Sequence, residues 1–196
     1  MAAAVTIAAI ALGSAADALE YDRSAVASGE WWRPFTGQFV HWTPRMAWID
    51  LGAFLTLAAA LEWRSRTLAV ATLVAAALVI GAGIHFLLAE LARYRGSSGL
   101  ACAFFVAVAA DLAFARGTNG TRGLRWLAIA ALLAFAAKST WELATPSSSF
   151  VGNLPSGVTV SPAVHLLGGL AGFAVVAIAA IRAKRMAPRS EATARS

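Results

Sequence analysis

The sequence predicts an all-α, polytopic membrane protein built as a bundle of six transmembrane helices. Of its 196 residues, 59% are hydrophobic and only 13% are charged, which is far outside the balance of soluble domains. Several apolar runs are long enough to cross a bilayer, which takes about 20 residues each. Most of the net charge of +6 lies in short loops and in the tail, where basic residues orient membrane helices. This charge therefore does not indicate nucleic-acid binding.

The first apolar run, residues 2–18, is rich in alanine and is expected to form the first transmembrane helix. A secretory signal peptide is the alternative, because residues 13–16 offer small side chains for cleavage. No Lys or Arg precedes Arg23, so the basic start of a signal peptide is missing. We therefore favour a transmembrane helix.

A long connection, residues 19–45, follows the first helix. Four of the seven tryptophans of the chain lie at or before Trp48, around this connection. Tryptophan prefers the headgroup level of a membrane. We expect an interfacial loop with short amphipathic helices that lie in the membrane plane.

Five further helices are expected at about residues 46–63, 68–91, 98–115, 124–143 and 163–181. A lone carboxylate in a membrane helix, such as Asp50, should face the protein interior. Lys138 and Glu142 are four residues apart and predict a structural ion pair. The single cysteine, Cys102, excludes an internal disulfide and a multi-cysteine metal site.

The chain is expected to form one membrane domain over residues 1–185, followed by a disordered basic tail over residues 186–196. Residues 145–162 are rich in proline and serine and predict a flexible loop. The even-numbered loops and the tail carry more Lys and Arg than the other loops, so they should face the cytoplasm. Both termini are then cytoplasmic, and the starts of the fourth and sixth helices face the periplasmic side of a bacterial inner membrane.

Ser98 lies in a short polar break, residues 94–100, between two apolar runs. Polar groups at membrane depth are costly and suggest function. Gly96 and Gly99 flank Ser98, so another backbone or a substrate strand can approach it closely. Backbone N–H groups in the first turn of a helix lack helical partners and can hold an oxyanion. The alternative is helix packing alone, because small residues are common in membrane helices.

His165 lies at the outer start of the sixth helix, at the same depth as Ser98. Gly168 and Gly172 form a small-xxx-small face, which lets two helices touch at their backbones. His165 precedes Gly168 by one turn and lies on a similar face. An imidazole beside a serine takes the hydroxyl proton during nucleophilic attack, and its ordinary pKa suits this role. An interfacial histidine without catalytic function is the alternative.

Together these features resemble the rhomboid family of intramembrane serine proteases. The shared features are six helices, a tryptophan-rich first loop with Trp32-Arg33, Gly-x-Ser-Gly at the start of the fourth helix and His-x-x-Gly in the sixth. The chain is most similar to the rhombosortase branch. The motifs of this second resemblance are Asp22-Arg23, Gly29 to Arg33, Thr36-Gly37, Val40-His41 and Tyr94 to Gly99.

The resemblance implies a Ser–His dyad in which Ser98 is the nucleophile and His165 the general base, without a metal or organic cofactor. The implied partners are the lipid bilayer and a membrane-anchored protein substrate with a transmembrane segment. For the rhombosortase branch, this segment is a C-terminal anchor with a Gly-Gly motif, an apolar helix and a basic end. Nucleic acid is not an implied partner.

The second helix departs from the family pattern. Rhomboids usually carry His-x-x-x-Asn there, whose side chains help to hold the oxyanion, whereas this chain has Met46 and Asp50. His41 is expected to supply the missing donor, with Asp50, Gly96 and Gly99 as further supporting residues. Asp50 can help only if it is protonated or if it orients His165 or a water. Loss of one such donor lowers the rate by about a hundredfold or more. A histidine often found four residues after the serine in rhombosortases is replaced by Cys102.

Two other functions remain open at this point. The altered second helix fits an inactive rhomboid-like protein that binds transmembrane segments. A small transporter would place Asp50, Asp111, Lys138 and Glu142 along one polar path, although no internal repeat of the kind common in transporters is visible.

Overall fold

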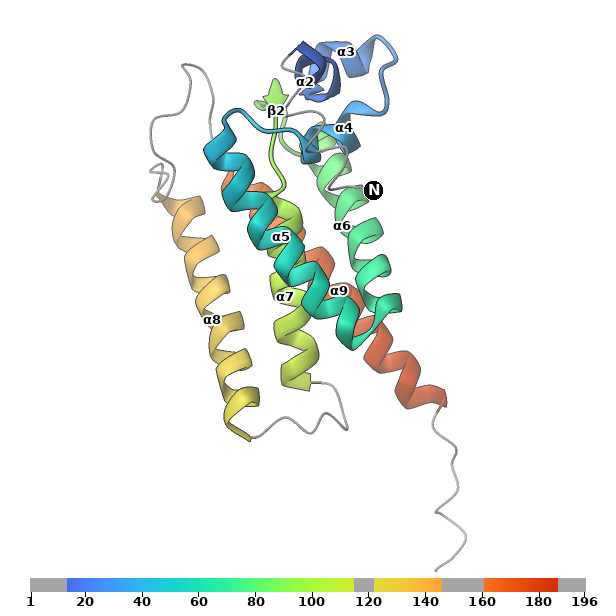
Figure 1. Cartoon of the computed structure of the whole chain (residues 1–196), viewed down its shortest axis with the longest axis vertical. Helices are drawn as coiled ribbons and strands as arrows, with labels where there is room; N and C mark the ends of the chain where they lie inside the picture. The colour runs from blue at the N-terminus through green and yellow to red at the C-terminus, as the bar shows by residue number, and fades with distance from the viewer. Residues whose placement is uncertain (1–13, 115–121, 146–160, 187–196) are drawn as a thin grey trace, which may run out of the picture.

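The computed structural model describes residues 14–114, 122–145 and 161–186. Within these ranges the protein is mostly helical (Figure 1). Four of the described helices are long and apolar enough to cross a membrane: α5 (Pro44–Arg64), α6 (Arg66–Phe86), α8 (Arg122–Ala144) and α9 (Pro162–Met186). A fifth apolar helix, α7 (Ser98–Phe114), has 17 residues. These five match the predicted second to sixth helices in order.

The other predicted segments fall largely outside the described residues. Of the first predicted transmembrane helix, the structure describes only its end, in α2 (Ser14–Leu19). The expected flexible loop and the expected tail also lie almost wholly outside the described ranges. The all-α prediction needs one correction, because two short strands are present in the loop region.

α7 is the central helix of the bundle (Figure 1). It contacts α5, α6, α8 and α9, and most of its residues are buried. Its most extensive packing is with α9. α8 contacts α7 and α9 but buries only Ala128 and Ser139 completely. α7 therefore forms the core of the bundle, although its first residue, Ser98, is partly exposed.

The α7–α9 packing brings two backbones into direct contact. A Cβ added to Gly168 would lie 2.1 Å from the carbonyl oxygen of Gly99, and one added to Gly172 would lie 2.1 Å from that of Ala103. No side chain fits in either place. Small residues four apart on one helix permit this kind of close approach.

Short elements at one end of the bundle form the first loop: α3 (Arg23–Ala27), α4 (Arg33–Thr36) and η1 (Gly37–Phe39). Just before them, strand β1 (Tyr21–Asp22) pairs antiparallel with β2 (Arg93–Tyr94), so that Tyr21 lies opposite Tyr94. The expectation of a loop with short helices is confirmed, whereas the strand pair was not predicted. The pair fastens the loop to the segment that leads into Ser98.

α6 ends at Phe86, so the predicted end at residue 91 is wrong. The guanidinium of Arg23 lies at this end and donates hydrogen bonds to backbone carbonyl groups. The acceptors are Ile84, His85, Leu88 and Leu91, at 2.7–3.3 Å. The last carbonyl groups of a helix have no helical partner, and here a side chain from the first loop supplies one. The chain can therefore leave the helix early although its sequence stays apolar.

Candidate active site

Ser98 and His165 lie together at one end of the bundle. Ser98 is the first residue of α7, and His165 is in the first turn of α9. The Nε2 atom of His165 lies 3.1 Å from the Oγ atom of Ser98, which is hydrogen-bond distance. The backbone contact between Gly168 and Gly99 holds the two helices together beside this pair. Gly99 follows Ser98 directly, and Gly168 is one turn from His165.

The backbone before Ser98 is held in an unusual conformation. Gly96 has a φ of +138°, a region that side chains rarely adopt. Its N–H donates to the carbonyl oxygen of Gly37 at 3.1 Å, and the hydroxyl of Tyr94 donates to its carbonyl oxygen at 2.9 Å. Burial, with the nearby Asp50 carboxylate as a smaller cause, raises the pKa of Tyr94, so this hydroxyl stays protonated. These bonds fix the peptide that presents Ser98.

Salt bridges to residues that precede β1 also hold the segment before Ser98. The buried carboxylate of Glu20 accepts hydrogen bonds from Arg93 and from Arg95, both at 2.7 Å from Nε. The Arg95 guanidinium also stacks over the Trp42 ring, 4.3 Å from its centroid, and pairs with Asp17. Sequence reasoning missed this cluster, because its members come from segments about seventy residues apart.

The structure brings the predicted oxyanion residues near Ser98, but His41 contacts its neighbour. The Nε2 atom of His41 accepts from the Ser97 N–H at 3.3 Å and lies 3.2 Å from the Ser97 Oγ. Asp50 faces the interior as predicted, with 16% of its side chain exposed, and its Oδ2 lies 3.5 Å from the same nitrogen. Asp50 also lies beside Gly96. Met46 follows the helix cap at Thr43 and offers no donor side chain.

A second Ser–His pair therefore accompanies the predicted one. Ser97 is completely buried, whereas Ser98 is partly exposed. A nucleophile must be reached by its substrate, so exposure favours Ser98. The His41–Ser97 contact instead links the first loop to the start of α7.

Glu142 is a member of the site that sequence reasoning assigned only to an ion pair. That pair is confirmed, with 2.7 Å between the Lys138 Nζ and the Glu142 Oε1. The other oxygen, Oε2, lies 3.9 Å from the Nδ1 atom of His165. The only sequence signal was the spacing within α8, and this spacing says nothing about a contact with α9.

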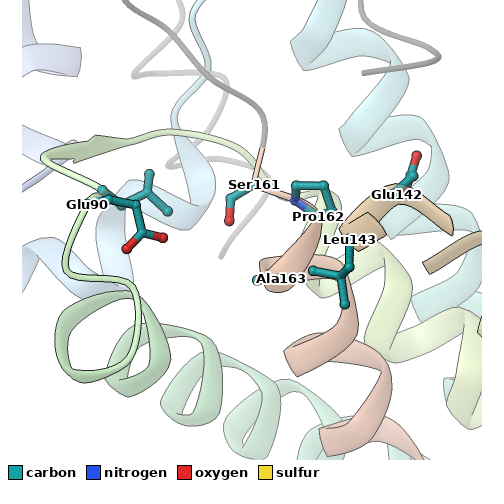
Figure 2. Close-up of a pocket in the computed structure, with 7 residues that line it drawn as sticks. Glu90, Glu142, Leu143, Ser161, Pro162 and Ala163 are labelled. Atoms are coloured by element: carbon teal, nitrogen blue, oxygen red, sulfur yellow. The ribbon is translucent and has the colours of Figure 1, made fainter. Parts of the chain in front are cut away.

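A pocket of about 250 Å³ lies beside the site, between the segment after α6 and the adjoining ends of α8 and α9 (Figure 2). Glu90 lies on one side of it, and Glu142 and Leu143 lie on the other. Its lining residues are Glu90, Leu91, Glu142, Leu143, Ser161, Pro162 and Ala163. Neither Ser98 nor His165 lines this pocket, but its lining includes Glu142 and the residues just before His165 in α9.

Asp111 lies far from the Ser98–His165 site. It is 13 residues beyond Ser98 along α7, about 20 Å at the rise of an α-helix. There its Oδ2 accepts from the Arg64 Nε at 2.5 Å. The structure thus separates Asp111 from the other members of the polar path that a transporter would need. Among the described residues, no group of three His, Cys, Asp or Glu side chains is arranged to hold a metal ion.

Comparison with family models identifies a Rhomboid domain over residues 28–182. The chain belongs to the rhomboid family. Comparisons with curated proteins and with solved structures found no match. Rhomboid proteins act on membrane proteins within the bilayer, and most are serine proteases, although inactive members exist.

The matched range covers α5 to α8, α9 as far as Arg182, and the first loop from Ser28 onward. Its match and the apolar helices establish an integral membrane protein. Ser98, His165, His41 and Asp50 all fall within the matched range. His165 is the histidine of α9 in this rhomboid protein. Among the described residues, Ser98 supplies the hydroxyl that pairs with it.

Proposed function

We propose that this rhomboid protein is an intramembrane serine endopeptidase with Ser98 as nucleophile and His165 as general base. The observation that carries the proposal is the distance of 3.1 Å between the Ser98 Oγ and the His165 Nε2 at the meeting point of α7 and α9. A serine within hydrogen-bond reach of an imidazole is the arrangement of an activated nucleophile.

The proposed reaction runs through an acyl-enzyme. The Ser98 Oγ forms a bond to the substrate carbonyl carbon while its proton passes to the His165 Nε2. The carbonyl oxygen becomes an oxyanion, held by the Ser98 N–H and by a donor such as His41. His165 then protonates the leaving amine as the peptide bond breaks. Water attacks the ester with His165 again as the base, and Ser98 is restored.

The proposed substrates are membrane-anchored proteins with a transmembrane segment. The rhombosortase-like motifs between Asp22 and His41 and from Tyr94 to Gly99 point to C-terminal anchors that carry a Gly-Gly motif. Small residues such as these weaken a helix and let the backbone extend into a site. The closely held Gly96–Gly99 segment offers backbone that an extended strand can approach.

We further propose that the site faces the periplasmic side of a bacterial inner membrane, with both termini in the cytoplasm. Arg64 and Arg66 lie at the end of the bundle opposite to Ser98 and His165. Basic residues are more frequent on the cytoplasmic side of membrane proteins.

A second candidate function is an inactive rhomboid that binds transmembrane segments. The observation in its favour is the replacement of the usual oxyanion residues by Met46 and Asp50. An ionised Asp50 beside Gly96 would repel an oxyanion that forms near Ser98.

Covalent labelling by a fluorophosphonate probe separates these functions. We expect the detergent-purified protein to be labelled, and Ser98→Ala and His165→Ala to abolish labelling. Ser97→Ala is the matched control and should keep most of it. No labelling of the folded wild-type protein would support the inactive alternative. Labelling that survives in Ser98→Ala but disappears in Ser97→Ala would identify the His41–Ser97 pair as the reactive one.

A further inference from the structure

We infer that Glu142 is a positioning residue for His165, so that the site is a Ser98–His165–Glu142 triad rather than a dyad. The inference rests on the proposed function, because it concerns how His165 acts as a base. It deepens that function by assigning a role to a carboxylate on α8, a helix that contributes neither member of the dyad.

The two ring nitrogens of His165 have different neighbours. Nε2 faces the Ser98 Oγ at 3.1 Å, and it must be unprotonated to receive the serine proton. The proton of the neutral ring is then on Nδ1. This atom faces the Glu142 Oε2 at 3.9 Å.

Both atoms of this contact are buried and lack a hydrogen-bond partner among the described residues. A buried donor or acceptor without a partner costs about 1–3 kcal/mol. A distance of 3.9 Å is too long for a hydrogen bond, but a shift of about 1 Å makes one. Catalytic hydrogen bonds are often long in a free enzyme and shorten when substrate binds. Each atom is thus the nearest available partner of the other.

The remaining charged groups that face His165 do not compete for Nδ1. These are Lys138 on α8 and Asp50 on α5. Lys138 binds the other carboxylate oxygen of Glu142 at 2.7 Å, which leaves Oε2 directed at the ring. The Asp50 carboxylate lies instead beside His41.

The chemical role follows from the charge that develops during attack. When the Ser98 proton reaches Nε2, His165 becomes an imidazolium with protons on both nitrogens. The Glu142 carboxylate stabilises this positive charge and keeps the ring in the tautomer that can accept the proton. In this role the proton stays on His165 and does not pass to the carboxylate, as in a Ser-His-Asp triad.

The test measures the kinetics of fluorophosphonate labelling at Ser98 in the full-length protein in detergent. Glu142→Gln has nearly the same shape but no charge. We expect it to lower the maximal labelling rate by at least about 10-fold and at most about 10⁴-fold, the loss seen when a Ser-His-Asp triad loses this charge, while the probe concentration at half-maximal rate stays unchanged. Glu62→Gln is the matched control, because Glu62 also pairs with a cation four residues away but is exposed at the far end of α5. Its labelling rate should equal that of the wild type.

Lys138→Met separates positioning of His165 from a merely structural ion pair. It breaks the same salt bridge but leaves Oε2 facing His165, so its loss should be much smaller than that of Glu142→Gln. Equal losses in the two variants would overturn the inference. Unchanged labelling in Glu142→Gln, with none in Ser98→Ala and His165→Ala, would also overturn it and leave the proposed function standing. If the folded wild-type protein is not labelled, both the inference and the proposed function are overturned.

A spectroscopic measurement keeps the inference testable if Glu142→Gln fails to fold. Nitrogen NMR of the wild-type protein with labelled histidine, assigned through His165→Ala, reports which ring nitrogen carries the proton. The triad requires protonation at Nδ1 when the ring is neutral. A neutral His165 protonated at Nε2 would overturn the inference.

Discussion

Gly168 lies against Gly99 so closely that a methyl group on Gly168 would come within 2.1 Å of the Gly99 carbonyl oxygen. Gly99 follows Ser98 directly, and Gly168 is one turn from His165. The distance between Ser98 and His165 is therefore set by contact between two backbones rather than by flexible side chains.

Enlarging Gly168 should separate α7 from α9 and move His165 away from Ser98. We expect Gly168→Leu to lower fluorophosphonate labelling by about 100-fold or more, because a misplacement of about 1 Å can have this effect. Gly52→Ala is the control, since a Cβ at Gly52 meets nothing within 4 Å. Wild-type labelling in Gly168→Leu would show that this contact does not hold the catalytic pair.

Substitutions of Asp50 and of His41 should change the labelling rate in opposite directions. We expect Asp50→Asn to raise the labelling rate by roughly tenfold, because it removes a negative charge and adds an N–H donor near Ser98. His41→Ala should lower the rate by about a hundredfold or more, because it removes the proposed donor. A fall in Asp50→Asn would mean instead that the carboxylate orients His41, which lies 3.5 Å away.

Arg23 should stabilise the whole bundle through the end of α6. Arg23→Met removes a guanidinium that donates to four backbone carbonyl groups. We expect the free energy of unfolding to fall by roughly 2–4 kcal/mol, since these acceptors lose their partner. Thermal or denaturant unfolding in detergent measures this. Arg66→Met, at a side chain that is 85% exposed, should change stability very little.

Asp22 should contribute a pH-dependent part of the stability. Hydrogen bonds from the Ser24 hydroxyl and the Ala25 N–H hold its pKa below the usual value in the folded protein. Its stabilising effect is therefore complete above the unfolded pKa of about 4 and is lost as the pH falls through the folded value. The melting temperature of Asp22→Asn should lie below that of the wild type at pH 6, and the difference should vanish in strong acid. A difference that is independent of pH would contradict this assignment.

The proximity of Ser98 and His165 could be predicted from sequence because each residue carries its own local pattern. Ser98 lies between glycines at the start of an apolar run, and His165 precedes Gly168 by one turn. Counting helices predicted that the two residues lie at the same end of the bundle, and they do. The start of α7 at Ser98 was predicted correctly for the same reason.

Contacts that join distant segments could not be predicted in this way. Residues 87–91 are mostly apolar, so nothing in them marks the end of α6, which depends on Arg23 from another segment. A two-residue strand such as Tyr21–Asp22 is too short to show an alternating pattern. The approach of Glu142 to His165 depends on how α8 packs against α9.

α7 is also short in relation to its surroundings. As far as the structure describes it, the helix has 17 residues, or about 26 Å, whereas the hydrocarbon core of a typical bilayer is about 30 Å thick. Because other helices rather than lipid cover α7, this span lies away from at least one surface of such a bilayer. The thickness of the host membrane therefore decides how far Ser98 lies from bulk water, and lipids with longer chains would place its hydroxyl deeper without any change in the protein.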